Sequence, residues 1–574
     1  MSGSATDVPD DVRAALPGKL LDIPRVGGPR TAHAMTRSRS AAAPHTTTQS
    51  HTTTQSHTTT RSHTTARSST PVGARRIAPR GAPATLDTSA ASDVSTAKAA
   101  TDGGTQTVDT FGWDTVFAIS LTDANRAIVD HRSSPAGFEF RDESWGISCR
   151  GEFGDWQITL GGDGANIWLS LPISDVRGSY PGPDAAVTFS HPAMTATVQI
   201  RLHYLPQPAP VPVDPARPGP VPHDLVPRSA TEDPADPVAA LVAVDWAGAE
   251  PSQAVAKYLI EGALVGWCND HLDQFAHVFA TVELNRYIDS GDFAFCKPTY
   301  LSYAYVETDS GRDGILGVLC MTGGRPPGNN AQQLTPLAIP AGTRAGFNIG
   351  EGRLLQDMIL PTIPLAWSHA RTSDFVPGSD GHSITLADGA SVRLPDVHHN
   401  GRSYTPHLTR FTLTIVNSVI QVDAYTKVDL GLGVTGWCQS VHRYTIGLGT
   451  NAHGQQTLVY RPVGTPVEQH GTTIESMVTT IVLIVLGVLV AVILAILTEG
   501  IALLVAGLVA GLLFGVAGMT PQMIAAVNTD RAPNIDLLAF NATHPITWPN
   551  SAAFTLRTVG LHSALQLGGD PGFI

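Results

Sequence analysis

The chain has 574 residues, of which 36 are Lys or Arg and 49 are Asp or Glu, and its formal net charge is −13. The first hundred residues hold 12 basic and 6 acidic side chains, a charge of +6, so the remainder carries −13 − 6 = −19. An acidic body argues against general nucleic-acid binding, which needs a concentrated positive surface. The five cysteines are far apart and form no CxxC pair, which argues against a disulfide framework or a structural zinc site.

Residues 1–108 are predicted to be a disordered basic tail. They contain no aromatic residue and are rich in Pro, Ser, Thr, Ala and Gly, so they cannot bury enough apolar surface to offset the loss of chain entropy. A hexapeptide repeat places histidines in register at positions 45, 51, 57 and 63. We interpret the repeat as a low-complexity linker, with weak metal binding or a secretion tag as alternatives.

The N-terminus has no apolar core of signal-peptide length and has acidic residues where a positive region is expected. The sequence therefore predicts synthesis in the cytoplasm without a secretory signal peptide. Membrane association and non-classical export both remain compatible with this pattern.

The folded region is predicted to span residues 109–574, beginning with a β-favouring segment at residues 111–120. Ser120 and Asp123 then form a capping-box-like start to a helix. Apolar residues alternate along residues 156–171, interrupted by a glycine-containing turn, and again along 196–205 and 410–416. Long alternating strands with few helices predict an α+β protein with a curved antiparallel sheet.

Residues 206–237 hold 11 prolines and are predicted to be a loop insertion without a core of its own. A helix is predicted to follow, because residues 251–267 place apolar side chains at helical spacing. These side chains are expected to pack against a sheet, and they are Val255, Tyr258, Leu259, Ala263 and Leu264.

Two uncharged apolar segments, residues 477–497 and 501–519, are separated by Thr498, Glu499 and Gly500. Each is long enough to cross about 30 Å of hydrocarbon as a helix. Small residues recur at four-residue spacing in both segments, a pattern that lets two helices approach closely in a membrane. These residues are Gly487, Ala491 and Ala495 in the first segment and Gly507, Gly511 and Gly515 in the second.

The pattern predicts an apolar helical hairpin over residues 477–519. Three placements remain open for this hairpin. It spans a bilayer, it packs on the soluble fold or plugs one end of it, or it enters a membrane only on activation. No Lys or Arg flanks the central break, so no positive-inside signal fixes an orientation.

The sequence contains no specific catalytic motif. It lacks a GxSxG elbow, a Walker-type phosphate loop and an HExxH zinc motif. His398 and His399 are adjacent, and neighbouring residues of a strand point to opposite faces, so they make a poor metal pair. We therefore expect a non-enzymatic protein and predict no catalytic, cofactor-binding or metal-binding residue.

Four sequence blocks resemble a known family. They are FGWDTVFAIS at 111–120, FAHVFATVELN at 275–285, the segment 292–326 that begins DFAFCKPTYLSYAYVETDSGRDG, and FNIGEGRLLQDMILP at 347–361. Together they resemble the forty-seven-kilodalton protein and OrfX family of clostridial botulinum-neurotoxin gene clusters. The basic tail, its repeats and the proline-rich segment depart from the family pattern.

The resemblance implies a tubular lipid-binding (TULIP) fold, in which a curved antiparallel sheet wraps long helices. It also implies binding of phospholipid or phosphoinositide and an accessory role beside a protein toxin. The expected partners are therefore lipid, a membrane, and a protein toxin or a related accessory protein, without nucleic acid. In such a fold the apolar stripe of residues 251–267 becomes a candidate lining for acyl chains.

Overall fold

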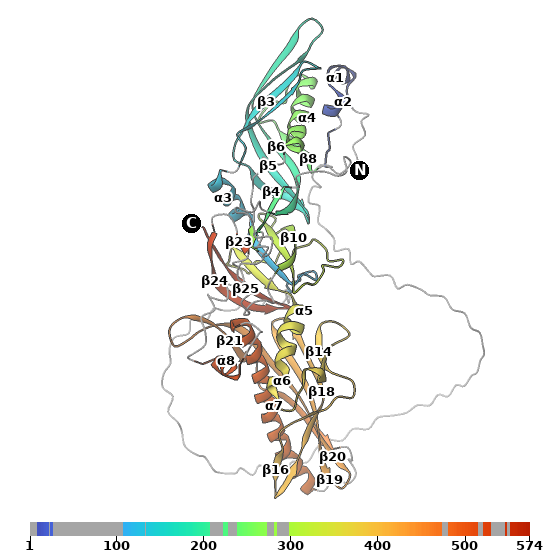
Figure 1. The fold of residues 1–574 in the computed structure, drawn as a ribbon, viewed down its shortest axis with the longest axis vertical. Helices are drawn as coiled ribbons and strands as arrows, with labels where there is room; N and C mark the ends of the chain where they lie inside the picture. The colour runs from blue at the N-terminus through green and yellow to red at the C-terminus, as the bar shows by residue number, and fades with distance from the viewer. Residues whose placement is uncertain are drawn as a thin grey trace, which may run out of the picture. The chain divides into compact units, whose positions relative to one another are not determined.

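The fold was analysed in a computed structural model (Figure 1). The residues it describes are 8–21, 23–26, 107–132, 134–206, 222–227, 238–271, 281–283, 298–472, 480–514, 520–529, 546–547 and 551–573. Three large sheets dominate these residues, and all pairings between their strands are antiparallel. The predicted α+β class with mostly antiparallel sheets and few helices is therefore confirmed.

A nine-stranded sheet contains two long neighbouring strands, β5 (Asn166–Pro181) and β6 (Ala186–Pro206). Helix α4 (Ala254–Asp270) contacts this sheet and lies beside its strands (Figure 1). The remaining strands are β2 (Gly137–Asp142), β3 (Ile147–Phe153), β4 (Gln157–Asp163), β7 (Pro222–Pro227), β8 (Ala239–Asp245), β9 (Thr281–Glu283) and β23 (Ile546–Thr547).

A six-stranded sheet combines segments from distant parts of the chain in the order β10-β11-β1-β12-β25-β24. Every described residue of its strand β11 is buried, as expected for a strand covered on both faces. The strands are β1 (Thr115–Ser120), β10 (Pro298–Glu307), β11 (Gly314–Thr322), β12 (Ala345–Ile349), β24 (Ser551–His562) and β25 (Ala564–Phe573).

An eight-stranded sheet is built around three long strands, β18 (Pro406–Val416), β19 (Val419–Gly431) and β20 (Val434–Thr450). Their buried and half-buried residues alternate, so one face of the sheet carries the core. The shorter strands are β13 (Phe375–Pro377), β14 (Ser383–Leu386), β15 (Val392–Arg393), β21 (Gln456–Pro462) and β22 (Val467–Thr472), and β16 (Val397–His399) pairs with β17 (Arg402–Tyr404) separately.

Helix α7 (Thr480–Phe514) lies along the core face of the eight-stranded sheet, where it contacts β19, β20 and β21 (Figure 1). It also contacts a helical run that begins at α5 (Glu351–Arg353) and ends at α6 (Ile363–Ala366). That run includes a π-helical stretch, Leu354–Ile359, and a 3₁₀ turn, Leu360–Thr362. The other short helical elements of the C-terminal half are a 3₁₀ turn at Thr372–Asp374 and α8 (Pro521–Ala526).

The prediction of a disordered tail is corrected at residues 8–21. These residues form two short helices, α1 (Asp10–Ala15) and α2 (Gly18–Leu21), that contact α4. Val12, Leu16 and Leu20 recur every four residues and are fully buried, so this segment has an apolar stripe that the average composition of the tail conceals. The histidine repeats lie outside the described residues.

Several local predictions are confirmed. Helix α3 (Leu121–His131) begins at Ser120, whose side chain accepts a hydrogen bond from the backbone N–H of Asp123. Strand β4 pairs with β5 as the predicted hairpin, although its turn falls at residues 164–165 rather than at 161–164. Within the predicted proline-rich insertion 206–237, Pro222–Pro227 forms strand β7, and the rest beyond residue 206 lies outside the described residues.

Candidate functional site

Helix α7 replaces the predicted helical hairpin with one continuous helix. It runs for 35 residues, a length of about 52 Å, through the position of the expected break. The Thr498 hydroxyl donates to the carbonyl of Leu494 at 2.7 Å, and the Glu499 side chain is exposed, so neither polar residue is left unsatisfied inside the helix. Gly500 faces the Trp367 indole, which packs where a side chain would otherwise lie.

The two stripes of small residues therefore cannot pack against each other, because both lie on one helix. Gly487, Ala491 and Ala495 are exposed, and a side chain added at Gly487 would meet open space. Gly507 is buried against the Thr362 side chain. Gly511 lies in the helix near its C-terminal end, and Gly515 lies outside the described residues.

The inner face of α7 is a core surface. It packs Leu486 against Gly436 of β20, where a Cβ would approach Leu486 Cδ1 to 2.8 Å. Farther along, it meets the helical run through Trp367 and Thr362. The buried aliphatic residues on this side are Leu486, Leu489, Val490, Ile493, Leu497, Ile501, Leu504, Val505, Leu508 and Val509.

The outer face of α7 is also apolar, although it is exposed. Val488, Val492 and Leu503 are 41%, 38% and 39% exposed, and their spacing of four and eleven residues places them on one side of the helix. Gly487, Ala491 and Ala495 fill the surface between them, and Glu499 is the one charged residue of the described helix. This face has the chemistry of a surface that binds aliphatic chains, and its length and hydropathy also suit a membrane span over Val485–Ala510.

The predicted lining residues of α4 are packed into the core. Val255, Leu259, Ala263 and Leu264 are buried and Tyr258 is partly buried, in one cluster with the apolar residues of the surrounding strands. None of these five residues lines either of the two cavities described below. The structure therefore places them in a closed helix-to-sheet contact.

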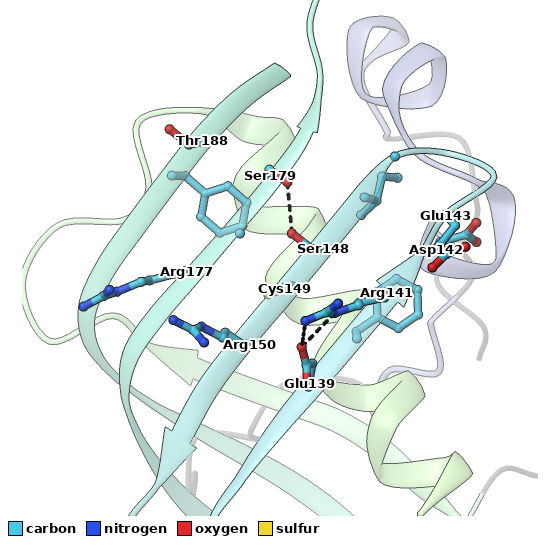
Figure 2. Close-up of a pocket in the computed structure, with 15 residues that line it drawn as sticks. Glu139, Arg141, Asp142, Glu143, Ser148, Cys149, Arg150, Arg177, Ser179 and Thr188 are labelled. Atoms are coloured by element: carbon cyan, nitrogen blue, oxygen red, sulfur yellow. Dashed lines mark hydrogen bonds and ion pairs between the residues drawn. The ribbon is translucent and has the colours of Figure 1, made fainter. Parts of the chain in front are cut away.

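A hollow of about 600 Å³ opens on the nine-stranded sheet across β2, β3, β5 and β6 (Figure 2). Arg150 of β3 lies directly opposite Arg177 of β5 in the strand register, and the two side chains lie next to each other in Figure 2. Two residue pairs further along, on the same face of the sheet, the Ser148 and Ser179 hydroxyls form a 2.9 Å hydrogen bond. Two arginines at opposed positions repel each other unless an anion lies between them.

The arginines of this hollow differ in their partners. Arg177 binds Asp175, and a third arginine, Arg141, binds Glu139, with shortest distances of 2.6 Å in both pairs. Arg150 makes no hydrogen bond or ion pair within the described part of the chain. The hollow therefore offers one free guanidinium and neighbouring hydroxyl groups, the donors that bind phosphate or carboxylate oxygens.

A second cavity, of about 540 Å³, lies where three of the four sequence blocks meet. Asp114 of the first block accepts from the backbone N–H of Thr322 at 2.6 Å and pairs with Arg325 of the third block at 2.9 Å. Arg325 in turn binds Asp357 of the fourth block at 3.0 Å, and Asp357 also binds the buried Arg353. These blocks therefore converge on a chain of alternating carboxylates and guanidiniums.

This network links the blocks through ion pairs. Asp114 pairs with Arg325, and Asp357 pairs with both Arg325 and Arg353, so the two carboxylates and the two guanidiniums balance in charge. Nearby, burial raises the pKa of Glu351, while a hydrogen bond from His382 at 3.2 Å opposes the shift. The described residues hold no group of three or more His, Cys, Asp or Glu side chains arranged to bind a metal ion.

Sequence reasoning missed the residues that distinguish these sites. Val488, Val492 and Leu503 were hidden in a segment that is apolar on all sides, which has no preferred face. The Arg150–Arg177 pair depends on strand register. The alternation of β3 would have placed Arg150 outward, but nothing in the sequence pairs it with Arg177.

Comparison with known proteins places the chain in a family. The family model described as OrfX-like, Protein OrfX2/OrfX3/P47, matches residues 110–569. Protein OrfX3 of Paraclostridium bifermentans is 33% identical over 495 residues, which cover 81% of this chain and 99% of that protein. Protein OrfX3 of Clostridium botulinum (strain Kyoto / Type A2) is 32% identical over 80% of this chain and 98% of that protein.

Solved structures agree with this assignment at the level of the fold. The structure of P47 from Clostridium botulinum A2 matches 81% of this chain and 98% of its own, with a TM-score of 0.55 and 15% identity. That of P47 from Clostridium botulinum E1 covers 80% and 99%, with a TM-score of 0.54 and 14% identity. The chain belongs to the OrfX-like family of OrfX2, OrfX3 and P47 proteins.

Proposed function

We propose that this protein binds phospholipid surfaces without catalysing a reaction, through the outward apolar face of α7. The observation that carries the proposal is the row of exposed side chains at Val488, Val492 and Leu503 on a helix whose one charged residue is Glu499. Glu499 is exposed on the same side of the helix, between Ala495 and Leu503, so the uninterrupted part of the apolar face runs from Gly487 to Ala495. An uncovered apolar patch on a soluble protein indicates a site for a partner or a membrane.

The expected binding is reversible. Moving the exposed part of each large aliphatic side chain out of water contributes about 1 kcal/mol, so the three together contribute a few kcal/mol. That is comparable to the marginal membrane affinity of a single acyl anchor rather than to the insertion of a transmembrane helix. Apolar contact along α7 therefore suits a protein that samples lipid surfaces.

Membrane insertion of α7 is the alternative function. The helix is long enough, but ten of its aliphatic residues are buried against the protein, from Leu486 to Val509. Insertion therefore requires α7 to leave the eight-stranded sheet and expose the apolar face of β19 and β20. An activating condition would have to stabilise that opened sheet.

A tubular lipid-binding arrangement and an accessory role beside a protein toxin belong to the same proposal. The pairing of α4 with one antiparallel sheet and of α7 with another is compatible with the tubular arrangement. The accessory role rests on family membership and on the resemblance of the sequence blocks. The non-enzymatic part of the proposal rests on the same family membership.

A phosphoinositide headgroup is a second candidate ligand, favoured by the opposed Arg150 and Arg177. The double variant Arg150→Gln/Arg177→Gln should reduce the added affinity for vesicles containing phosphoinositide and leave affinity for neutral vesicles unchanged. The double variant Arg402→Gln/Arg410→Gln, which removes one exposed arginine from β17 and one from β18, is the matched control. An equal loss of vesicle affinity in both double variants would mean that the effect comes from general surface charge.

Vesicle flotation of the full chain tests the main proposal. The variant Val488→Ser/Val492→Ser should lower vesicle affinity about tenfold, which corresponds to about 1.4 kcal/mol. Val376→Ser/Val416→Ser is the matched control, because these exposed valines lie on β13 and β18 rather than on α7. Failure of the parent chain to float, or equal losses in the two variants, would contradict the proposal.

A carbonate wash of the vesicle-bound protein separates the two functions. Release by carbonate indicates surface binding through the outer face of α7. Retention in the lipid fraction indicates insertion of the helix and favours the alternative.

A further inference from the structure

The hairpin between β19 and β20 ends in a two-residue turn, Leu432–Gly433, because Gly431 and Val434 are the last paired residues. Both turn residues have left-handed backbone angles, with φ of 55° at Leu432 and 78° at Gly433. The Leu432 side chain is 104% exposed, so it makes essentially no contact with the rest of the protein. A leucine at this position is unfavourable twice, through backbone strain and through exposure of apolar surface.

Other hairpins of the same region use the residue that the geometry favours. The β16–β17 turn is Asn400–Gly401, with φ of 48° and 74°, and the β18–β19 turn begins with Asn417 at φ 56°. Asparagine adopts left-handed angles more readily than leucine and exposes a polar side chain. Leu432 differs from the asparagines of these two turns because it is an apolar residue at a left-handed turn position.

Leu432 lies toward the same end of the eight-stranded sheet as the exposed valines of α7. Leu486 of α7 packs at Gly436 and beside Leu430, only a few residues from the turn, and Val488 follows it on the outer face. Gly431 and Gly433 flank Leu432 without side chains, while the exposed Asp429 carboxylate accepts a 2.8 Å hydrogen bond from the Gly431 N–H at the base of the turn. The turn and the start of the α7 outer face therefore form neighbouring apolar features.

The opposite turn of strand β19 is covered by protein. The carbonyl of Asn417 accepts a 2.9 Å hydrogen bond from the backbone N–H of Ser563, in the link between β24 and β25. The 13 residues of β19 separate the two turns by about 40 Å. A favourable polar residue thus occupies the covered end of the strand and a strained apolar residue occupies the open end.

We propose that Leu432 is a lipid-inserting tip, which enters the acyl region of a phospholipid bilayer when the end of the eight-stranded sheet that carries Val488 of α7 meets the bilayer surface. This inference rests on the proposed lipid-binding function and names the end of the molecule that enters the membrane. A bilayer is favoured over a protein partner because one protruding side chain between two glycines offers little area for a specific protein interface, which needs on the order of 800 Å² per partner. A fluid acyl layer accepts an isolated leucine without shape complementarity.

The variant Leu432→Asn tests the contribution of Leu432 to membrane binding without destabilising the fold. Asparagine suits the turn, so the variant should be at least as stable as the parent chain in urea unfolding. Its affinity for phosphatidylcholine vesicles should nevertheless fall about tenfold, the loss expected when one leucine no longer enters the acyl region. Unchanged affinity would overturn the proposal.

An environment-sensitive fluorophore on Leu432→Cys measures insertion directly. On vesicle binding its emission should shift to the blue, and lipids carrying a quencher in the acyl chain should quench it. The same fluorophore on Ser418→Cys, at the covered end of β19, should show neither change. If the labelled protein binds vesicles without a fluorescence shift at position 432, the insertion of Leu432 is overturned and the lipid-binding function is not. If the parent chain does not bind vesicles at all, both proposals are overturned.

Discussion

Gly500 of α7 lies against the indole of Trp367, so closely that a Cβ at position 500 would overlap the indole nitrogen. Trp367 is buried and packs its other side edge-on against Phe411 of β18, with ring centroids 6.0 Å apart. One glycine thus brings the helix, the indole and the eight-stranded sheet into contact. The residue that suggested a break between two helices is the residue that lets a single helix pack.

Substitution of Gly500 should distinguish the contribution of packing to stability from that of helix propensity. Gly500→Ala gains about 1 kcal/mol of helix propensity but forces the Trp367 indole to move, and we expect a net loss of about 1–3 kcal/mol. Gly487→Ala is the control, because its Cβ meets open space and should stabilise the helix by up to about 1 kcal/mol. Urea unfolding measures both, and equal stability of the two variants would refute the packing argument.

The ionic network in which the sequence blocks meet should contribute measurably to the stability of the fold. Asp114→Asn removes the carboxylate that binds Arg325 and the Thr322 N–H and should cost about 2 kcal/mol, since both donors lose a charged hydrogen-bond partner. Arg393→Gln breaks the more exposed pair with Asp396 and should cost less than about 1 kcal/mol. Calorimetric melting of both variants makes the comparison. A loss at Asp114 no greater than that at Arg393 would mean that the network does not stabilise the fold.

A buried histidine in β20 should make stability depend on pH. Burial lowers the pKa of His442 to about 4, against about 6.5 in an unfolded chain, and its Nε2 lies 3.0 Å from the Ser440 hydroxyl. The unfolded chain therefore binds the proton first, so this contribution to stability is complete above pH 6.5 and falls as pH drops toward 4. The loss reaches about 2 kcal/mol at pH 5 and about 3 kcal/mol at pH 4.

The variant His442→Gln should flatten this part of the profile of unfolding free energy against pH. Some slope remains, because burial also lowers the pKa of His562. A profile that is identical in the parent chain and in His442→Gln would show that the pKa of His442 is the same in the folded and the unfolded chain.

The buried thiols should resist modification. Burial raises the pKa of Cys149, Cys268 and Cys320 to about 12 and that of Cys438 to about 11, so little thiolate exists at pH 8. We expect at most one fast-reacting thiol in the native chain, Cys296, which lies outside the described residues, and five in urea. A thiol-counting reagent gives both numbers. Two or more fast native thiols would contradict the predicted burial and would also complicate labelling at position 432.

The local elements that sequence predicted correctly depend on neighbouring residues. The start of α3 needs only Ser120 and the N–H of Asp123 three residues on, and the alternation of Phe411, Leu413 and Ile415 identifies the core face of β18. Each of these patterns lies within one segment, so no distant contact was needed to recognise it.

The family also followed from sequence alone, because its blocks are long and keep their order along the chain. Their meeting at one ionic network did not, since Asp114 and Asp357 are brought together by the six-stranded sheet and the helical run that follows it. In the same way, the opposition of Arg150 and Arg177 exists only in the register of two paired strands.

The apolar segment shows most clearly which features depend on sequence and which depend on tertiary structure. Sequence alone determined that residues 477–497 and 501–519 are uncharged and long enough to form apolar helices, and it predicted a break at Thr498, Glu499 and Gly500 that the structure does not contain. An apolar helix is equally suited to hydrocarbon and to the core face of a sheet, so its composition does not select between them. Tertiary structure decided the outcome: the eight-stranded sheet and Trp367 bury one face and leave Val488 and Val492 exposed, because Gly436 and Gly500 allow the helix to approach closely.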